Sequence, residues 1–494
     1  MAIGYTTMTF DQTAAAPGLP LIIQGGMGAG VSNWMLARAV SLRGQLGVVS
    51  GTVIDTIFVR RLQDGDPGGH LRRAMAHFPC PAIADAALAR YFRPEGRADG
   101  APYKALPTYK QVVSAARQQV TMLAGFAEVW LAKEGHRNPV GINLLTKVQM
   151  PNLATLYGAM LAGVNVVLMG AGIPREIPGV LDALAIHQPA ELRLDVEGGG
   201  DPVLLRFDPQ EHGVMPTPLR RPAFYPIVSA NSLATTLARK ANGRVDGFVI
   251  EGPTAGGHNA PPRGELRLSE TGEPVYGDRD VVDLAKIREL GLPFWLAGGT
   301  GSPDGLRDAL AVGAAGVQVG TLFAFANESG LLPELREEVL AGVLRGEVEV
   351  RTDPRASPTG YPFKIVRMDG GRFQAPDRDR VCDLGYLRTA YRKEDGAIGY
   401  RCPAEPVDAY VAKGGSVADT EGRRCLCNAL LANIGLGQVR PRGDDERPLI
   451  TSGDDLLRMA AFLNGRTAYT AADVLDYLLA GATGSVAAPP VAAA

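Results

Sequence analysis

Cysteine is scarce in this chain, which holds five among its 494 residues. So few thiols in so long a sequence do not make the disulfide framework of a small secreted domain. Long apolar runs are missing as well, because none approaches the roughly 20 residues that cross a bilayer. The N-terminal stretch MAIGYTTMTFDQTAAAPG lacks the basic-then-apolar order of a secretory signal. These absences predict a cytoplasmic protein that does not bind membranes.

An excess of charge of either sign is also absent. The formal net charge is −2, so there is no global basic field to attract nucleic acid or anionic lipid. With 46% hydrophobic and 21% charged residues, the composition is that of a folded chain and not of a disordered one. The length exceeds one ordinary core, which predicts a large domain with a substantial appendage.

Short β-rich runs alternate with helix-like stretches over the first two thirds of the chain. The runs lack a clean polar and apolar alternation, which is typical of parallel strands buried on both faces. Between them lie amphipathic segments such as DVVDLAKIRELG, in which Val281, Leu284 and Ile287 recur at helical spacing. The expected strands are 20–24, 46–50, 140–145, 164–169, 225–230, 247–250, 293–297 and 316–319.

Eight such strand-then-helix units favour an α/β fold, a (β/α)8 TIM barrel over residues 18–330. A doubly wound open sheet is the main rival, since the number of strands and helices alone does not separate the two. Ser32 and Ser302 precede two of the expected helices, and their hydroxyls are expected to cap them.

Two insertions and an appendage interrupt the alternation. Residues 53–138 are expected to be mostly helical, and residues 187–222 to form a glycine-turned hairpin and a proline-rich loop. Residues 331–480 are expected to form a mostly helical C-terminal extension, which could be a lid, a dimer contact or a dock for a carrier protein. The last segment, 481–494, has the composition of a disordered tail.

Glycines collect where the expected strands end, in QGGMG, SGT, GAG, EGPTAGGH, AGGTG and QVGT. Active sites of TIM barrels lie at these ends, and the turns after strands seven and eight usually bind phosphate. Glycine lets backbone N–H groups approach an anion closely. Gly298, Gly299 and Gly320 are therefore expected to bind a phosphate, the alternative being that they only make tight turns. GGMGAG lacks the third glycine of a dinucleotide fingerprint.

Six sequence blocks occur in order: LPLIIQGGMG, PVGINLL, NVVLMGAGIP, VIEGPTAGGH, PFWLAGGTG and VQVGTLFAFANES. Together they resemble the nitronate monooxygenase (2-nitropropane dioxygenase) family, whose barrel is shared by the FMN-dependent enoyl-acyl-carrier-protein reductases. The resemblance covers about residues 18–330 and implies FMN as the cofactor. It is much less specific for the substrate.

The resemblance also implies which residues bind the cofactor. Gly26 and Met27 would approach the isoalloxazine ring from the first strand, and Asn143 would hydrogen-bond it from the third. Glu251 stands where the monooxygenases often have glutamine and the enoyl reductases usually have glutamate. The other implied contacts are Gly298, Gly299, Gly320 and Thr321 at the phosphate, Gly256 and Gly257 adjoining it, and Gln318 in the flavin pocket.

His258 follows two glycines at the end of a strand, where little packing could demand an imidazole. A near-neutral pKa suits an imidazole to proton transfer at physiological pH. By resemblance His258 would lie beside the flavin N5 edge, as a base or as a donor that polarises the substrate. The alternative is a histidine that only caps the loop.

Three functions remain open on the sequence. The first is an FMN-dependent oxidoreductase that oxidises small alkyl nitronates with O2. The second is an enoyl-thioester reductase that uses NAD(P)H and docks an acyl carrier protein. The third is a module that binds FMN or another phosphate ligand without turnover. A homodimer fits any of them.

The extension carries two further features. Arg355, Tyr361 and Lys364 lie in the turn-rich stretch RTDPRASPTGYPFKIV, which forms either a substrate loop over the barrel mouth or a plain linker. Four cysteines follow, but CLC has one intervening residue where zinc motifs usually have two to four. We therefore expect no metal site, and buried reduced thiols at Cys382, Cys402, Cys425 and Cys427.

Overall fold

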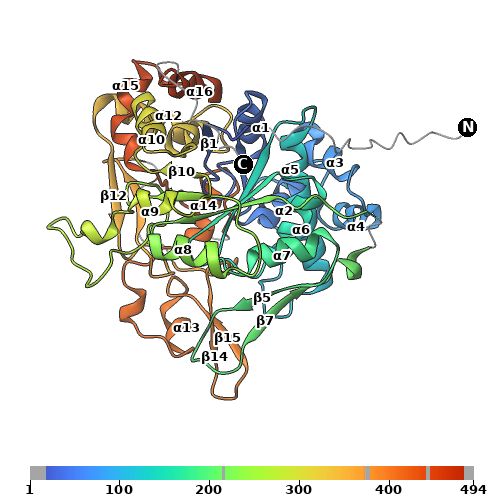
Figure 1. Ribbon diagram of the computed structural model, residues 1–494. Helices are drawn as coiled ribbons and strands as arrows, with labels where there is room; N and C mark the ends of the chain where they lie inside the picture. Colours follow the sequence, from blue (N-terminus) through green and yellow to red (C-terminus); the bar gives the residue numbers. More distant parts are fainter. Residues whose placement is uncertain (1–17, 214–216, 372, 374–378, 441–445, 483–494) are drawn as a thin grey trace, which may run out of the picture.

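The eight expected strands close into a barrel (Figure 1). We describe a computed structural model, in which residues 18–213, 217–371, 373, 379–440 and 446–482 are placed. The strands are parallel, in the order β1-β11-β10-β9-β8-β4-β3-β2. Their bounds are β1 (Ile22–Gln24), β2 (Gly47–Ser50), β3 (Val140–Leu145), β4 (Val166–Gly170), β8 (Ala223–Val228), β9 (Phe248–Glu251), β10 (Phe294–Ala297) and β11 (Gly316–Val319).

The first and second strands complete the ring. Gln24 N donates to Leu46 O at 2.9 Å, and Leu46 N donates to Ile22 O at 3.1 Å, beside a parallel bridge between Ile23 and Leu46. An open doubly wound sheet would leave these two edges apart. The (β/α)8 barrel is therefore confirmed.

Apolar side chains fill the interior of the barrel. The rings of Tyr225 and Trp295 lie 4.8 Å apart, and the Trp295 indole N–H donates to Pro20 O at 2.8 Å. Alternate residues of the same strands face outward into a second core under the helices. The barrel interior is thus a packed hydrophobic core below a glycine-rich rim. Its buried members are Ile23, Leu46, Val48, Val166, Leu168, Tyr225, Val249, Trp295 and Ala297.

Helices follow the strands around the outside (Figure 1). Ser302 caps α10 as expected, accepting from Gly305 N at 3.0 Å. The cap of α1 is Asn33 and not Ser32, because the Ser32 hydroxyl accepts from Met27 N and donates to Gly25 O, both at 2.8 Å. These helices are α1 (Trp34–Leu42), α6 (Asn152–Leu161), α7 (Ile177–Ala185), α8 (Asn231–Lys240), η3 (Asp278–Asp280), α9 (Leu284–Arg288), α10 (Pro303–Ala311), α11 (Thr321–Ala324) and α12 (Pro333–Arg345).

Both insertions have the expected secondary structure. The first is helical, and the second contains an antiparallel pair, β5 with β7, followed by a short 3-10 turn. The elements of the first are α2 (Ile54–Gln63), η1 (Pro67–Gly69), α3 (His70–Met75), α4 (Pro81–Tyr91) and α5 (Ala115–Lys133). Those of the second are β5 (Ala190–Leu194), β6 (Val196–Glu197), β7 (Val203–Phe207) and η2 (Pro209–His212).

The C-terminal extension contains strands in addition to the expected helices. β12 pairs antiparallel with β13, and β14 pairs with β15 and with β6 of the second insertion. Figure 1 shows β14 and β15 beside the β5/β7 pair, away from α16. The elements are β12 (Glu349–Asp353), β13 (Phe363–Arg367), β14 (Thr389–Arg392), β15 (Ile398–Arg401), α13 (Val407–Val411), η4 (Ala418–Thr420), α14 (Leu426–Ala432), η5 (Asp454–Arg458), α15 (Met459–Leu463) and α16 (Ala471–Leu479).

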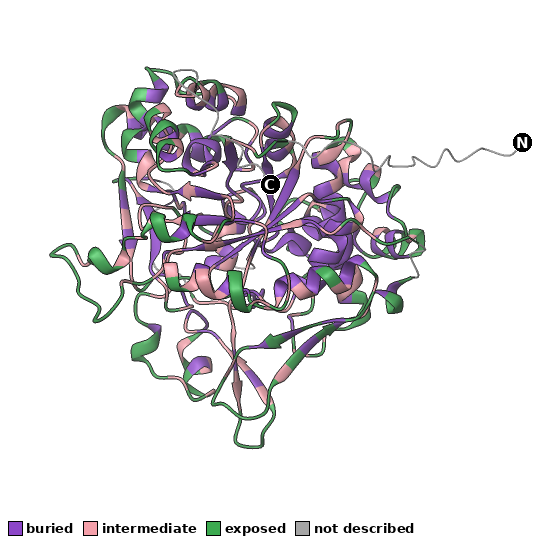
Figure 2. Ribbon diagram, viewed as in Figure 1, coloured by how far each residue is buried: buried purple, intermediate pink, exposed green. Residues whose placement is uncertain are grey.

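Burial is concentrated in the barrel strands and the helices against them, whereas the β5/β7 pair alternates buried and exposed residues and β14 and β15 are mostly half-buried (Figure 2). Among the placed residues, no helix combines the length and apolar character that a bilayer crossing requires. Most of the expected tail, 483–494, lies outside the described residues.

Candidate active site

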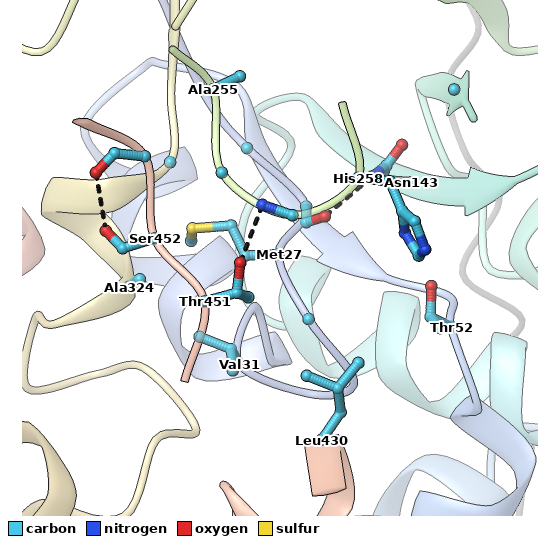
Figure 3. Close-up of a pocket in the computed structure, with 18 of the residues that line it drawn as sticks. Met27, Val31, Thr52, Asn143, Ala255, His258, Ala324, Leu430, Thr451 and Ser452 are labelled. Carbon is cyan, nitrogen blue, oxygen red and sulfur yellow. Dashed lines mark hydrogen bonds between the residues drawn. The ribbon is translucent and has the colours of Figure 1, made fainter. Parts of the chain in front are cut away.

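One cavity of about 230 Å³ opens at the carboxyl ends of the barrel strands. Residues of the rim and of the extension surround it, as Figure 3 shows for Met27, Asn143 and His258 on one side and Leu430 and Thr451 on the other. Of the twelve predicted site residues only Gly299 is not in its wall. The eleven that line it are Gly26, Met27, Asn143, Glu251, Gly256, Gly257, His258, Gly298, Gln318, Gly320 and Thr321.

The end of β1 is held against the end of β3. Asn143 Nδ2 donates to Gly26 O at 2.8 Å, and a Cβ on Gly26 would lie 2.3 Å from Cβ of Asn143. Only glycine fits here. The Asn143 Oδ1 atom is buried and has no hydrogen-bond donor among the described residues, and the same is true of Oε1 of Gln318 at the end of β11.

The turn after β10 is built for glycine. Gly298 and Gly299 have φ of 89° and 71°, and a Cβ on Gly298 would lie 2.8 Å from Ala255 N. Among the described residues, neither N–H donates a hydrogen bond. An anion with several oxygens could use these two amides.

A segment of the extension, residues 451–455 (TSGDD), closes this side of the cavity. Thr451 Oγ1 accepts from Gly257 N at 2.9 Å, and Gly453 N donates to Thr321 Oγ1 at 3.0 Å. The Asp455 carboxylate accepts from Gly301 N at 3.1 Å, just before α10, and burial raises the pKa of Asp455. Sequence reasoning missed this segment, which lies far along the chain from the turns it contacts.

Glu251 ends β9 and its carboxyl group lines the cavity. Burial raises the pKa of Glu251 to about 8. At neutral pH the side chain is therefore mostly protonated, and it can donate a hydrogen bond to a ligand.

The extension also fixes the loop that carries His258. Lys364 N donates to Gly257 O at 2.9 Å and Asn259 N donates to Pro362 O at 3.0 Å, so the loop pairs with the start of β13. The His258 ring packs edge-on against Phe363, with centroids 4.8 Å apart. His258 thus lies in the cavity wall with its backbone held on both sides.

A row of polar groups leads from His258 to Lys147. His258 Nε2 lies 2.7 Å from Ser357 Oγ, which lies 2.8 Å from Thr359 Oγ1. Lys147 Nζ donates to that Thr359 oxygen at 3.1 Å and lies over the ring of Tyr361. Sequence reasoning did not single out Ser357, Thr359 or Lys147.

Charge and burial set the protonation of this row. Burial lowers the pKa of Lys147 to about 7, and burial together with the Lys147 charge lowers the pKa of His258 to about 3. His258 is therefore a neutral imidazole at physiological pH. Among the described residues, the lysines that form ion pairs are Lys286, Lys364 and Lys413. Lys147 is not one of them and has no carboxylate partner in the described part of the chain.

The turn-rich stretch after the barrel lines the cavity through Phe363, which sequence reasoning did not single out. Tyr361 contacts Lys147, as described above. Lys364 is buried and pairs with Asp454 at 2.7 Å, and Arg355 is exposed and pairs with Glu421 at 3.2 Å. Neither Lys364 nor Arg355 lines the cavity.

The cavity wall suits FMN on observations of this structure. The orphaned oxygens of Asn143 and Gln318 are acceptors for an N–H such as the one on the flavin ring. The free amides of Gly298 and Gly299 suit a phosphate, and the Thr321 hydroxyl lies on the same side. The donors and acceptors that such a ligand requires are present.

Comparison with known proteins agrees with this chemistry. Residues 218–344 match a family model described as Nitronate monooxygenase, which confirms the resemblance seen in the sequence blocks. A nitronate monooxygenase of Pseudomonas aeruginosa is 37% identical over 111 residues, which are 22% of this chain and 27% of that protein.

Two further proteins are similar to this chain, one with a different named activity and one with lower sequence identity. A Mycobacterium tuberculosis protein named (3aS,4S,5R,7aS)-5-hydroxy-7a-methyl-1-oxo-octahydro-1H-indene-4-carboxyl-CoA dehydrogenase is 30% identical over 125 residues, 25% of this chain and 30% of that protein. These curated relatives are thus matched over less than a third of their own length. A solved nitroalkane oxidase of Streptomyces ansochromogenes is 16% identical, with 94% of this chain and 97% of that chain covered and a TM-score of 0.45.

Proposed function

We propose that this chain is an FMN-dependent oxidoreductase that oxidises small alkyl nitronates with O2. The observation that carries the proposal is the Lys147 ammonium group, which lacks a carboxylate partner and is linked through two hydroxyls to His258 in the cavity wall. A half-buried cation without a counter-ion favours an anionic ligand. A nitronate is such a ligand.

The cofactor would be held by the rim residues named above. Gly298, Gly299, Gly320 and Thr321 would hold the phosphate, with Gly256 and Gly257 adjoining. Met27 and Gly26 would lie against the ring, and Asn143, Gln318 and Glu251 would hydrogen-bond its polar edge. When bound, FMN supplies the two-electron acceptor that the reaction requires.

His258 would orient the substrate and take part in proton transfer at its carbon or oxygen. Because burial and the Lys147 charge keep the ring neutral at physiological pH, it can donate or accept a hydrogen bond without carrying a charge of its own. Ser357 would fix its orientation through Nε2. The protonated Glu251 side chain would not repel an anionic substrate, because its pKa is about 8.

Reduction of an enoyl thioester is the second candidate. It is favoured by the carboxyl-CoA substrate in the name of the mycobacterial relative and by glutamate at position 251. This function would require NAD(P)H as the reductant and an acyl carrier protein or coenzyme A as the carrier. A cytoplasmic location and a homodimer belong to either proposal.

An anaerobic flavin titration tests the proposal. The purified protein is expected to show a flavin spectrum that bleaches with propionate-3-nitronate and recovers when air is admitted. Rapid bleaching by NAD(P)H without any response to the nitronate would instead establish the second candidate. A protein that binds FMN and responds to neither reductant would be a binding module.

A further inference from the structure

Four of the five cysteines meet at a second, small cavity inside the C-terminal extension. Two come from the segments just before β14 and just after β15, and two from the start of α14. The cavity measures about 10 Å³ and is lined by Cys382, Cys402, Cys425 and Cys427, with Pro358, Leu384, Gly385, Leu387, Arg388, Ala404 and Leu426. None of these four cysteines forms a disulfide.

Cys382 and Cys402 line the same small cavity, and a hydrogen bond between their side chains shifts the pKa of both thiols. The backbone of Cys402 is fixed, because its N–H donates to Glu405 Oε1 at 3.2 Å and its carbonyl accepts from Glu405 N at 2.9 Å. Cys402 is buried, whereas Cys382 is partly exposed. Cys382 is thus the more accessible residue of the two.

We propose that Cys382 and Cys402 are a redox-active pair that forms a reversible disulfide, with Cys382 as the attacking thiol and Cys402 as the resolving one. The hydrogen bond from Cys402 lowers the pKa of Cys382, and the same bond raises the pKa of Cys402. This asymmetry is the one that thiol exchange requires, since the thiolate is the nucleophile.

The exchange balances with a small disulfide as the oxidant. The Cys382 thiolate attacks one sulfur of oxidised glutathione, whose S–S bond breaks and releases one glutathione thiolate. Cys402 then loses its proton and attacks the Cys382 sulfur, which releases the second glutathione. Two protein thiols are oxidised, one glutathione disulfide is reduced to two thiols, and the two protons pass to those thiols.

The other two cysteines are less suited to this chemistry. Burial raises the pKa of Cys427, so that its thiol stays protonated. The Cys425 sulfur accepts from Asn428 Nδ2 at 3.5 Å, at the start of α14. Within the described residues, no group of three or more His, Cys, Asp or Glu side chains is arranged around a metal position. A tetrahedral zinc site would need that arrangement.

The pair lies next to the candidate active site. Leu387, Leu426 and Cys427 form a wall that the small cavity shares with the large one. A disulfide between Cys382 and Cys402 would join the two flanks of the β14/β15 hairpin and restrict the unfolded chain. The oxidised protein is therefore expected to melt a few degrees above the reduced protein.

Thiol mapping on the full-length protein tests this proposal. The reduced protein is incubated with oxidised glutathione, denatured, alkylated with iodoacetamide and analysed by peptide mass spectrometry. We expect two thiols to escape alkylation and to appear as one peptide pair linked through Cys382 and Cys402. Reduction with dithiothreitol is expected to restore alkylation at both.

Variants separate the two roles. C402S is expected to stop at a stable glutathione adduct on Cys382, whereas C382S is expected to take no adduct at Cys402. C80S is the matched control, because Cys80 lies in the first insertion and contacts His212 O, and it should behave like the unmodified chain. If a serine variant does not fold, the mapping on the unmodified protein still decides.

Three results would overturn the proposal. The first is alkylation of all five cysteines after the oxidant. The second is a disulfide that uses Cys425 or Cys427. The third is one equivalent of zinc in the purified protein whose chelation exposes all four thiols together, which would mean a metal site in place of a redox pair.

Discussion

The Nε2 atom of His258 lies 2.7 Å from the hydroxyl of Ser357, a residue 99 positions further along the chain. The barrel thus supplies the imidazole, and the extension supplies the group that orients it. This relationship makes the extension part of the candidate active site.

Replacing Ser357 with alanine is expected to lower kcat for nitronate oxidation by roughly 3- to 10-fold. The lost hydrogen bond is worth about 0.5–1.5 kcal/mol, and His258 would keep its place but not its orientation. Steady-state kinetics measure the effect, with flavin content as a second readout. S232A, an exposed serine on α8, is the control. Equal kcat in both variants would remove Ser357 from the site.

Nitrate provides a test of the Lys147 charge that is independent of turnover. Nitrate is an anion at every working pH, whereas the Lys147 ammonium is fully present below its pKa of about 7 and is lost as the pH rises through it. The dissociation constant of nitrate should therefore rise between pH 6 and pH 8, by about tenfold.

The matched variants for this test are K147M and K240M. K147M should bind nitrate weakly at all pH values, because the charge is gone. K240M removes an exposed lysine on α8 and should keep the pH dependence of the unmodified chain. Nitrate binding that is independent of pH in the unmodified chain would contradict an anion site at Lys147.

The barrel was predictable because local signals agreed with the global fold. Six of the eight barrel strands end in or directly before glycine, and parallel strands bring those ends to one rim. The position of His258 in the cavity wall follows from that rule, whereas Asn143 and Glu251 were implied by the family resemblance. Ser302 was predictable as a cap because nothing else competes for its hydroxyl.

The remaining features depend on contacts that leave no local pattern. Ser32 and Asn33 are equally good caps, and only the tertiary bond from Ser32 to Gly25 O decides between them. Lys147 is linked to Ser357 through the hydroxyl of Thr359. Lys147 and Thr359 are 212 residues apart in the sequence, so no local pattern predicts this contact. The strands β12 to β15 are short and carry mixed charge, so their pairing with each other and with β6 was not foreseen.

Asp455 is expected to weaken phosphate binding. Its carboxylate accepts from Gly301 N on the side of the cavity where we propose the FMN phosphate, and two anions close together repel. D455N keeps an acceptor for Gly301 and removes the charge, so FMN should bind about tenfold more tightly. Fluorescence titration of the apoprotein measures this effect.

Riboflavin distinguishes repulsion from a general change in the site. It lacks the phosphate, so its affinity should be the same for D455N and for the unmodified chain. D304N is the control at the same helix, where the carboxylate is 73% exposed and screened by water. Equal gains for FMN and riboflavin would place the phosphate elsewhere.

A buried polar cluster joins the first insertion to the extension. Asp55 on α2 pairs with Arg117 on α5 at 2.8 Å and accepts from Tyr109 and from Tyr386 of the extension. Asp55 is fully buried, so removing its charge leaves the Arg117 guanidinium in the core without a negatively charged partner. D55N should therefore destabilise the protein by about 3–5 kcal/mol, measured by urea unfolding.

The control for D55N is a carboxylate that lies outside this buried cluster. D85N, an exposed carboxylate on α4, should change stability by less than about 0.5 kcal/mol. Y386F removes one hydrogen bond to Asp55, and its effect should be less than additive with D55N because both act on the same network. Additive losses would mean that Tyr386 and Asp55 act separately. Tyr386 also lines the large cavity. Coupling between Tyr386 and Asp55 would therefore mean that the folding of the extension affects the shape of the candidate active site.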